Sequence, residues 1–364
     1  MKSNSQEKIK ILISGYYGCA NAGDEAVLAG IFETFNLLKI DADIIVLTSD
    51  IEDTKDKYPN ANCVNKFSIL KVIKEIKNSD IVISGGGSLL QDVTSKKSLQ
   101  YYLLILRIAQ FFKKKTMIYA QGIGPLKDAS SRKSVAKVLK RVDEITVRDQ
   151  DSKNLLISLG ILPSKIEIVC DPAVLIEPDL HVSNIILKDL NAGNETLIGV
   201  SLRPWHNQEK WLNELAEGIK NACKKLHAKP IIISMQPEID LQLSKAFDDA
   251  IILPNIYDVK VLKGIISNCK LIVGMRLHSL IFAASERVPF VPISYDPKVN
   301  SFSETIGKKD IIDLENINSD DVCEKIIEEY SKREESFSIL SKKSSEMRAQ
   351  AIYAGTCLKE LIDK

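Results

Sequence analysis

The sequence has no apolar run long enough to cross a membrane. Its longest apolar stretch, Leu99–Phe112, is broken by Gln100, Arg107 and Gln110, and a membrane-spanning helix needs roughly 20 residues. The polar segment Met1–Lys10 also lacks the apolar region of a secretory signal. These features predict a protein of the cytoplasm that contacts a membrane at most from its surface.

The sequence also lacks an excess of charge of either sign, with 49 Lys and Arg against 48 Asp and Glu. We therefore predict no nucleic-acid partner, and any anion site must be local. The seven cysteines are odd in number and never spaced C-x-x-C, which argues against a disulfide framework or a zinc site. No cluster of carboxylates suited to a metal is visible, so we expect no metal. We also expect no cofactor.

Alternating strand and helix patterns fill most of the chain. They run from the strand pattern of residues 8–18 to a strand near Val169, and they resume at Thr196–Leu202. Such alternation predicts parallel sheets with right-handed crossovers, and 364 residues exceed the usual size of one core. We predict an α/β fold with Rossmann-like domains at residues 1–177 and 196–364 and a linker at about 178–195. Residues 319–364 are expected to form helices that close the second domain, although such a tail could also pack across the first.

Two glycine-bearing loops in the first half follow predicted strands and open predicted helices, which is where ligands bind in open α/β sheets. In residues 15–25, GYYGCANAGDE, small residues let backbone N–H groups approach a ligand, while Asp24 could equally cap the next helix. Residues 83–92, ISGGGSLLQD, contain three consecutive glycines, which lose much conformational entropy on folding. This cost is justified where another group must lie close to the backbone of the loop. That close neighbour could be a ligand or simply a packed helix.

A third loop, residues 272–281 with the sequence IVGMRLHSLI, places Arg276 and His278 at the start of a helix. A helix N-terminus favours anions, Arg can bond a carboxylate or phosphate in pairs, and His can exchange a proton near neutral pH. Lys298 follows the next strand and could join them on the same sheet edge, or it could be a solvated loop lysine.

Three further features remain open. Arg148 ends a strand in TVRD and could be a second anion clamp, or it could form a salt bridge to Asp149 or Asp151. Arg203, before Trp205 and His206, lies in a candidate binding loop. The run Leu99–Lys115 ends in FFKKK and could dock on an anionic lipid surface, but a buried helix with a solvated charged end explains it as well.

Taken together, the ordered motifs GYYG, NAGDEA, GGGSLLQD, YAQGIGP, TVRD, CDPA and GMRLHSLIFA resemble the polysaccharide pyruvyl transferase family. The resemblance covers nearly the whole chain and is strongest to the bacterial cell-surface anchoring type called CsaB. It implies a fold similar to the GT-B glycosyltransferases, in which two Rossmann-like domains face an interdomain cleft. The N-terminal domain would then be the acceptor side.

The resemblance further implies an enzyme that uses phosphoenolpyruvate as donor and forms a 4,6-pyruvate ketal on a sugar with release of phosphate. The implied acceptor is N-acetylmannosamine (ManNAc) in a lipid-linked or diphosphate-linked precursor of a secondary cell-wall polysaccharide, which serves S-layer anchoring. The enzyme would work in the cytoplasm and contact the inner membrane peripherally. Its oligomeric state stays open.

Carried onto this sequence, the family pattern assigns phosphoenolpyruvate to Arg148, Arg276, Leu277, His278 and Lys298. His278 is the implied general acid that protonates C3 of the enol, while the cations hold the carboxylate and the departing phosphate. Asp24 or Asp92 could act as base for a sugar hydroxyl. The candidate acceptor contacts are Tyr17, Asn21, Asp24, Gly86, Gly87, Gln91, Asp92 and Arg203.

Two other functions fit the same motifs. A GT-B glycosyltransferase with a nucleotide-sugar donor would share the fold and the glycine loops, so the released product distinguishes it. A noncatalytic sugar- or nucleotide-binding module would bind ligand without turnover.

Overall fold

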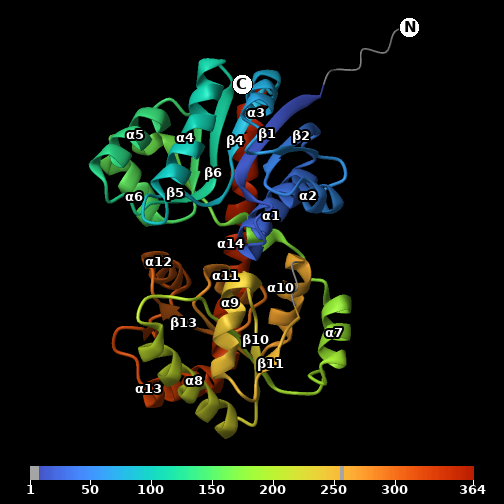
Figure 1. Ribbon diagram of the computed structural model, residues 1–364, viewed down its shortest axis with the longest axis vertical. Helices are drawn as coiled ribbons and strands as arrows, with labels where there is room; N and C mark the ends of the chain where they lie inside the picture. The colour runs from blue at the N-terminus through green and yellow to red at the C-terminus, as the bar shows by residue number, and fades with distance from the viewer. Residues whose placement is uncertain (1–7, 255–257) are drawn as a thin grey trace. The chain divides into compact units, whose positions relative to one another are not determined.

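The computed structural model describes residues 8–254 and 258–364, so residues 1–7 of the polar N-terminal segment lie outside the described part. The chain forms two compact units of mixed helix and strand (Figure 1). The first unit comprises the residues through Cys19, Asp24–Leu175 and Ala349–Lys364. The second comprises Ala20–Gly23 and Ile176–Arg348. The predicted α/β fold with two domains is confirmed.

The first unit is built on an eight-stranded parallel sheet with the order β3-β2-β1-β4-β6-β7-β8, and β5 pairs with β6. The order departs from the chain order at β1 and β4, which marks the crossover point where ligands bind in such sheets. Its strands are β1 (Ile9–Tyr17), β2 (Ala42–Thr48), β3 (Asn62–Asn65), β4 (Ile81–Ser84), β5 (Gly87–Leu90), β6 (Lys115–Ile123), β7 (Glu144–Val147) and β8 (Ile166–Ile168).

Helices cover both faces of this sheet. Successive side chains of β1 point to opposite faces and are apolar on both, so each face must be covered. Ile11 and Ile13 share one core cluster with Val27, whereas Leu12 shares another with Val72 and Ile105 on the opposite face. The helices are α1 (Ala22–Leu38), α2 (Ile51–Lys57), α3 (Ile69–Asn78), α4 (Lys96–Phe111), α5 (Ala129–Leu139) and α6 (Gln150–Ser158), with short 3₁₀ turns at Pro163–Lys165 and Pro172–Leu175.

The second unit has a six-stranded parallel sheet with the order β11-β10-β9-β12-β13-β14. Its strands are β9 (Leu197–Ser201), β10 (Lys229–Ile232), β11 (Ile251–Ile252), β12 (Leu271–Gly274), β13 (Phe290–Ser294) and β14 (Ile312–Asp313). Its helices are α7 (Leu180–Asp189), α8 (Gln208–Lys225), α9 (Pro237–Asp240), η3 (Leu241–Ala246), α10 (Val259–Asn268), α11 (Leu277–Ser285), α12 (Pro297–Ile306) and α13 (Ser319–Ser331).

The predicted linker at 178–195 instead contains a packed helix of the second unit. Asp179 caps α7 by accepting a hydrogen bond from the Val182 N–H at 2.9 Å. Ser183 and Leu187 are buried, and a Cβ added at Gly264 of α10 would lie 2.4 Å from the Ser183 hydroxyl. The prolines and polar residues of this segment therefore mark the ends of a helix rather than a flexible connection.

The C-terminal boundary also differs from the prediction, because the last helix, α14 (Arg333–Asp363), contributes to both units. Cys357, Leu358 and Leu361 belong to the core of the first unit. The Lys115 ammonium donates to the Leu361 carbonyl at 2.9 Å. The alternative that the tail packs on the first domain is thus correct for residues 349–364. Among the described residues, no helix is long and apolar enough to cross a membrane.

Candidate functional site

In the second unit, the carboxyl ends of three adjacent strands bring several predicted site residues to one edge. Arg203 follows β9, Arg276 follows β12, and Lys298 follows β13. The Met275 N–H donates to the Ser201 carbonyl at 2.8 Å, which ties the ends of β9 and β12 together. This edge is where open α/β sheets bind ligands.

Arg276 is held in place by an acidic partner that sequence reasoning missed. Its Nε donates to Asp240 Oδ2 at 3.1 Å, and its Nη2 donates to Asp240 Oδ1 and to Gln236 Oε1. Asp240 also accepts the N–H groups of Met235 and Gln236, so its carboxylate is itself fixed. A bidentate pair in a buried setting presents the guanidinium in one orientation. Arg276 is therefore pre-positioned as the N-cap residue of α11.

His278 lies in the first turn of α11 beside a segment of the first glycine loop. A Cβ added at Gly23 would lie 2.3 Å from His278 Nδ1, so only glycine fits there. The Ala22 N–H donates to the Met235 carbonyl at 2.8 Å, and Asn21 Oδ1 accepts the Gly23 N–H at 3.0 Å. The Asn21 side chain thus shapes the turn that approaches His278. Leu277 is buried, so its predicted contact with the donor can come only from its backbone.

Lys298, Arg203 and two aromatic rings form a second cluster at the same edge. The Arg203 guanidinium carbon lies 5.5 Å from the Trp205 ring centroid and 5.4 Å from that of Tyr295, and the two rings meet edge to face. The Lys298 ammonium lies 5.7 Å from the Tyr295 centroid and 3.7 Å from Asp296 Oδ2. Lys298 belongs to the first turn of α12 rather than to a loop. Its ammonium is therefore held near the sheet edge by an ion pair and a ring.

Arg203 has a further property that suits a binding residue. Its Nε is buried and has no hydrogen-bond partner among residues 8–254 and 258–364. A buried donor without a partner is costly and is commonly explained by a ligand or an unseen water. Trp205 and Tyr295 were not predicted as a pair because they are far apart in sequence. They follow β9 and β13, which lie on either side of β12 in the sheet.

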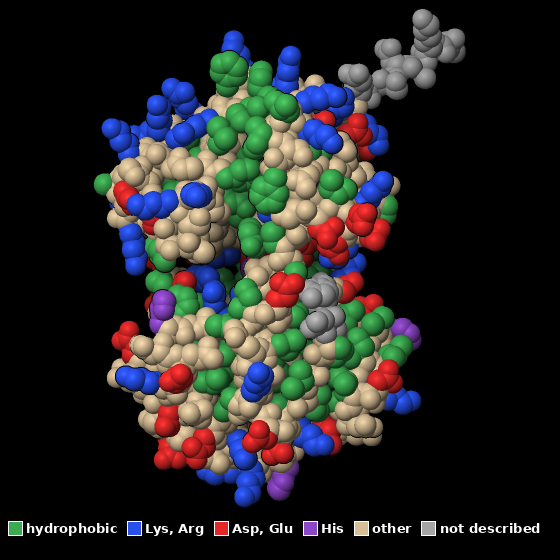
Figure 2. Space-filling model, viewed as in Figure 1, with side chains coloured by type: hydrophobic (Ala, Val, Ile, Leu, Met, Phe, Trp, Pro, Cys, Tyr) green, Lys and Arg blue, Asp and Glu red, His purple; other side chains and the backbone are tan. Residues whose placement is uncertain are grey.

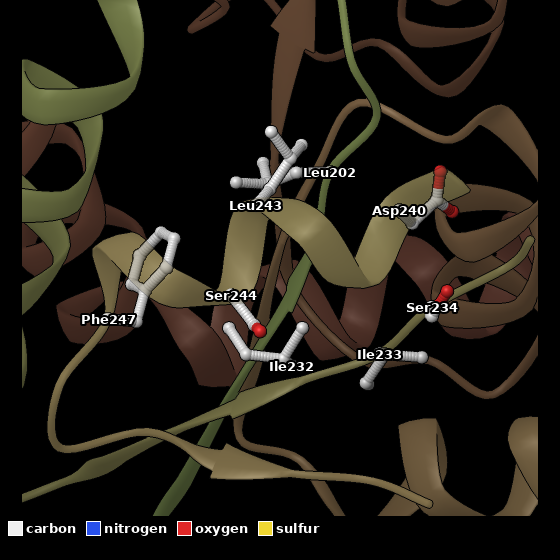
Figure 3. Close-up of a pocket in the computed structure, with 8 residues that line it drawn as sticks. All are labelled: Leu202, Ile232, Ile233, Ser234, Asp240, Leu243, Ser244 and Phe247. Carbon is white, nitrogen blue, oxygen red and sulfur yellow. The ribbon is translucent and has the colours of Figure 1, made fainter. Parts of the chain in front are cut away.

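A small cavity lies next to the Arg276–Asp240 pair (Figure 3). It has room for about one water molecule. Its walls are Leu202, Ile232, Ile233, Ser234, Asp240, Leu243, Ser244 and Phe247. Because these side chains are largely apolar and the space is small, it cannot hold a sugar or a phosphorylated acid.

In the first unit, the glycine loops pack around Tyr17 and Asp24. A Cβ added at Gly15 or Gly85 would lie 2.2 Å or 2.1 Å from Tyr17, so both glycines make room for the buried ring. Burial raises the pKa of Tyr17 well above its ordinary value, and the nearby Asp24 and Glu25 carboxylates raise it further. Tyr17 is therefore a neutral phenol buried inside the unit, and its predicted contact with the acceptor stays a prediction.

The other two glycines of the second loop, Gly86 and Gly87, have different neighbours: one lies against a core side chain and the other against a carboxylate. A Cβ added at Gly86 would lie 2.7 Å from a Val27 methyl, which is the packing explanation. Gly87 has a positive φ of 86°, and a Cβ there would lie 2.9 Å from Asp24 Oδ1. The Asp24 carboxylate therefore lies over the backbone of Gly87, and these two predicted acceptor residues are neighbours.

Two other predicted acceptor residues support the loop itself. Gln91 Oε1 accepts the Thr94 N–H at 2.9 Å, and Asp92 accepts the N–H groups of Lys127 and Asp128, each at 2.9 Å. Burial raises the pKa of Asp92, but these two hydrogen bonds outweigh burial and hold its pKa below 3.8. These contacts occupy one lone pair on each carboxylate oxygen and lower the basicity of Asp92, so they disfavour Asp92 relative to Asp24 as the base, which stays a prediction.

Arg148 is a buried cation of the first unit that also touches the second glycine loop. It donates to Asp171 at 3.3 Å and to the Ser88 hydroxyl at 2.9 Å, and its Nε lies 3.7 Å from Asp149. A Cβ added at Gly122 would lie 2.7 Å from its guanidinium. The predicted ion pair with Asp149 is thus present, whereas the closer partner, Asp171, was not predicted.

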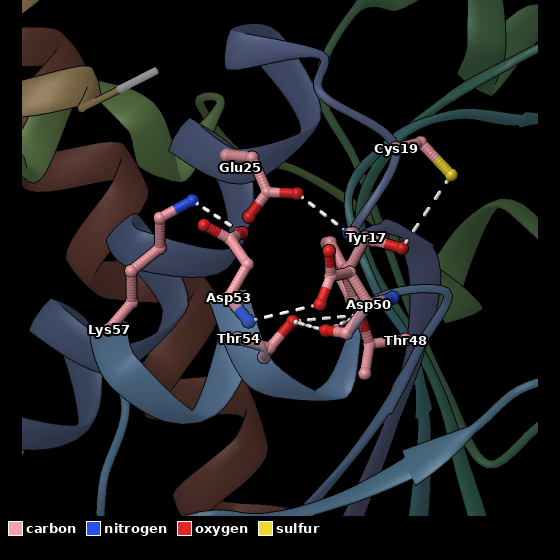
Figure 4. A network of polar contacts seen from close by, with 9 residues as sticks. Tyr17, Cys19, Glu25, Thr48, Asp50, Asp53, Thr54 and Lys57 are labelled. Carbon is pink, nitrogen blue, oxygen red and sulfur yellow. Dashed lines mark hydrogen bonds and ion pairs between the residues drawn. The ribbon is translucent and has the colours of Figure 1, made fainter. Parts of the chain in front are cut away.

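A polar network anchors the first glycine loop (Figure 4). Gly18 has a positive φ of 68°, and its N–H donates to Glu25 Oε1 at 2.8 Å. Thr48 and Thr54 share a hydrogen bond of 2.8 Å at the start of α2. Burial raises the pKa of Glu25 above 4.5. The loop is therefore rigid through contacts that sequence reasoning did not identify.

The predicted site residues thus belong to two different units of the chain. Arg276, His278, Lys298 and Arg203 belong to the second unit, whereas Asp24, Gly87 and Arg148 belong to the first. Within the described ranges, no group of three or more His, Cys, Asp or Glu side chains is arranged to hold a metal ion.

Comparison with known proteins adds a sequence relationship. A family model described as polysaccharide pyruvyl transferase matches residues 21–297. The chain is also 22% identical over 365 residues to the amylovoran biosynthesis protein AmsJ of Erwinia amylovora, covering 82% of this chain and 86% of that protein.

Solved structures of similar fold include UDP-N-acetylglucosamine 2-epimerases. A putative enzyme of this type from Listeria monocytogenes has a TM-score of 0.66 at 12% identity and covers 95% of this chain and 94% of its own. The Neisseria meningitidis enzyme bound to UDP-GlcNAc has a TM-score of 0.60 at 13% identity, covering 98% and 99%. Anabaena HepE in complex with UDP-glucose has a TM-score of 0.62 at 11% identity, covering 98% and 99%. These similarities confirm the GT-B-like fold.

Proposed function

The chain belongs to the polysaccharide pyruvyl transferase family, and from this premise we propose that phosphoenolpyruvate is its donor and a sugar 4,6-diol its acceptor. The product is a pyruvate ketal, and inorganic phosphate leaves. We further propose a cytoplasmic reaction on ManNAc in a lipid-linked precursor of a cell-wall polysaccharide used for S-layer anchoring. No cofactor is part of the proposal.

One observation carries the donor assignment. The carboxyl edge of the second sheet gathers a fixed guanidinium, an imidazole and an ammonium from Arg276, His278 and Lys298. Phosphoenolpyruvate carries a carboxylate and a phosphate, so two cations match its two anionic groups. The N-terminus of α11 adds N–H groups and the positive end of a helix dipole.

The chemistry follows from these groups. His278 donates a proton to C3 of the enol, and C2 becomes an oxocarbenium-like centre. One sugar hydroxyl adds to C2 and gives its proton to a general base. The phosphate then leaves with the C–O electron pair, and the second hydroxyl adds to the same carbon and closes the ketal with loss of its own proton. Arg276 and Lys298 stabilise the carboxylate and the phosphate as charge develops. Asp24 stays a candidate for accepting a hydroxyl proton, and Arg148 a candidate donor contact.

The acceptor side of the proposal rests on the aromatic cluster. Trp205 and Tyr295 offer ring faces beside the Arg203 guanidinium, whose Nε lacks a partner within the described residues. Aromatic rings with adjacent hydrogen-bond donors suit the mixed apolar and polar surface of a sugar. We propose that these three residues bind the acceptor sugar.

A product assay tests this function directly. Purified protein is incubated with phosphoenolpyruvate and a ManNAc-containing acceptor, and inorganic phosphate is measured. We expect phosphate release only when both substrates are present. If UDP is released from a nucleotide sugar instead, and no phosphate from phosphoenolpyruvate, the chain is a glycosyltransferase and the proposal fails.

A further inference from the structure

The outward faces of α3 and α4 in the first unit carry an unusual set of exposed apolar side chains. Leu70 is 85% exposed, Phe111 79% and Leu104 41%, and Phe67, just before α3, is 71% exposed. Isolated exposed apolar residues are ordinary, but several on neighbouring helices mark an interaction surface. Figure 2 shows hydrophobic side chains over the α3 and α4 part of this unit, with Lys and Arg side chains at their border.

These residues share one surface because the two helices lie side by side on the same sheet face. Val72 and Ile76 of α3 share a buried cluster with Ile105 and Ala109 of α4. The inward side of α4 is thus an ordinary core face, so burial explains only that side of the run Leu99–Lys115. The outward side remains to be explained.

Helical spacing places the exposed residues in two rows. Leu70, Lys74 and Lys77 follow one another along α3, and Leu104, Arg107 and Phe111 follow one another along α4. Steps of three and four residues keep side chains on one helix face. Each row therefore combines apolar residues with cations, and α4 alone extends about 24 Å.

The charge of this surface is one-sided although the whole chain carries a net charge of only +1. Helix α4 has no Asp or Glu, and α3 has only Glu75. The basic residues on the two helices and directly after α4 are Lys71, Lys74, Lys77, Lys96, Lys97, Arg107, Lys113 and Lys114. Cations that border exposed apolar side chains are complementary to a bilayer with anionic headgroups.

We propose that the outward faces of α3 and α4 form a docking surface for an anionic lipid bilayer. Leu70, Leu104 and Phe111 enter the headgroup region, and the surrounding lysines and Arg107 bind lipid phosphates. This binding requires no catalysis. If the acceptor is lipid-linked, as the proposed function holds, the surface would keep the enzyme where its acceptor lies.

Vesicle flotation tests the surface with the full-length protein. The probe is phosphatidylcholine vesicles with and without phosphatidylglycerol. Wild type should float only with the anionic vesicles, and added salt should weaken its binding because exposed charges are screened. Two variants should each lose at least about tenfold in vesicle affinity. The double variant Leu70→Ser/Phe111→Ser removes apolar side chains that enter the headgroup region. The triple variant Lys74→Glu/Lys77→Glu/Arg107→Glu replaces cations that attract anionic lipids with repelling carboxylates.

The matched control is Lys220→Glu/Lys224→Glu, which reverses exposed charges on α8 of the second unit and should leave binding unchanged. All substituted side chains are exposed, so circular dichroism should show folded proteins.

The proposal is overturned if wild type does not bind anionic vesicles or if the control variant loses binding as much as the test variants do. It is also overturned if the apolar variant instead changes the mass of the protein in light scattering without lipid, because the face would then join two copies of the chain. Phosphate release from a water-soluble acceptor should be unaffected, which separates this test from that of the proposed function.

Discussion

Asp240 shows how a single residue can decide the geometry of the candidate site. It bonds Arg276 through both carboxylate oxygens and is fixed by two backbone N–H groups, and it is 3% exposed. Removing one partner of a buried ion pair leaves a charge without compensation. The guanidinium would then lose both its orientation and its stabilising partner.

We therefore expect Asp240→Ala to lower the free energy of unfolding by about 3–5 kcal/mol. Urea denaturation followed by circular dichroism measures it. The exposed Asp248→Ala, eight residues later, is the control and should change stability by less than about 0.5 kcal/mol. Equal losses in both variants would show that the ion pair has no special role.

His278 is expected to act in proton transfer rather than in binding. His278→Gln should lower kcat by roughly 10²–10⁴-fold and change KM for phosphoenolpyruvate little, because general acid catalysis contributes about this much. Arg276→Lys should instead raise KM, since lysine cannot form the bidentate contact. Steady-state kinetics with phosphate detection measures both, and the exposed His181→Gln serves as control. An unchanged kcat in His278→Gln would remove the acid role.

The pH dependence of stability should report the buried Glu25. Burial raises its pKa above 4.5 in the folded chain, so the folded state holds this proton more tightly than the unfolded state. Its contribution is fully present below pH 4.5 and is lost as pH rises through the raised pKa. Wild type should therefore lose stability relative to Glu25→Gln between pH 4.5 and neutrality, measured by urea unfolding at several pH values. The exposed Glu52→Gln should show no such difference, and a difference of opposite sign would contradict the account.

At the scale of elements, the last helix gives the sharpest prediction. Alanine normally stabilises a helix interior over glycine by about 1 kcal/mol. In α14, however, a Cβ at Gly355 would lie 2.1 Å from a Thr34 methyl and 2.7 Å from Leu38. We expect Gly355→Ala to destabilise the protein by about 1–3 kcal/mol, because overpacking outweighs helix propensity.

Thermal unfolding of Gly355→Ala checks this, with the exposed Ser345→Ala of the same helix as control. Ser345→Ala should be neutral or slightly stabilising. If Gly355→Ala raised the melting temperature, the close packing of α14 on α1 would be refuted.

Elements with strong periodicity could be predicted from the sequence. The recurrence of apolar residues at helical spacing predicts helices at residues 69–78, 259–268 and 277–285, and α3, α10 and α11 occupy these ranges. Helix α7 was missed because its prolines and polar ends resemble a linker. Helix α12 was missed because it starts at Pro297 directly after a strand, where Pro suits the first helical position but also suits a turn.

The site was only partly predictable for a related reason. Arg276 and His278 are two residues apart in sequence and follow a buried strand, so the local pattern identified them. Asp240 is 36 residues away from Arg276 and lies in a four-residue helix without periodicity. The Trp205 and Tyr295 rings meet only because β9, β12 and β13 are neighbours in the sheet. Such pairings depend on strand order, which composition and spacing do not encode.

At the scale of the whole molecule, the alternation of strand and helix predicted two α/β units but misplaced their limits. The chain returns to the first unit at Ala349, and residues 20–23 of the first glycine loop group with the second. Both exceptions depend on contacts between distant parts of the chain. The proposed function requires His278 of the second unit as the proton donor, and one experiment tests that requirement.

The most direct measurement is mass spectrometry of the acceptor after reaction with phosphoenolpyruvate in deuterium oxide. The account predicts a ManNAc-containing product heavier by one pyruvate less water, with one deuterium in the ketal methyl group because C3 receives a solvent-derived proton. Wild type should form this product and His278→Gln only traces of it. An acceptor of unchanged mass would contradict the transfer, and a ketal without deuterium would contradict protonation at C3.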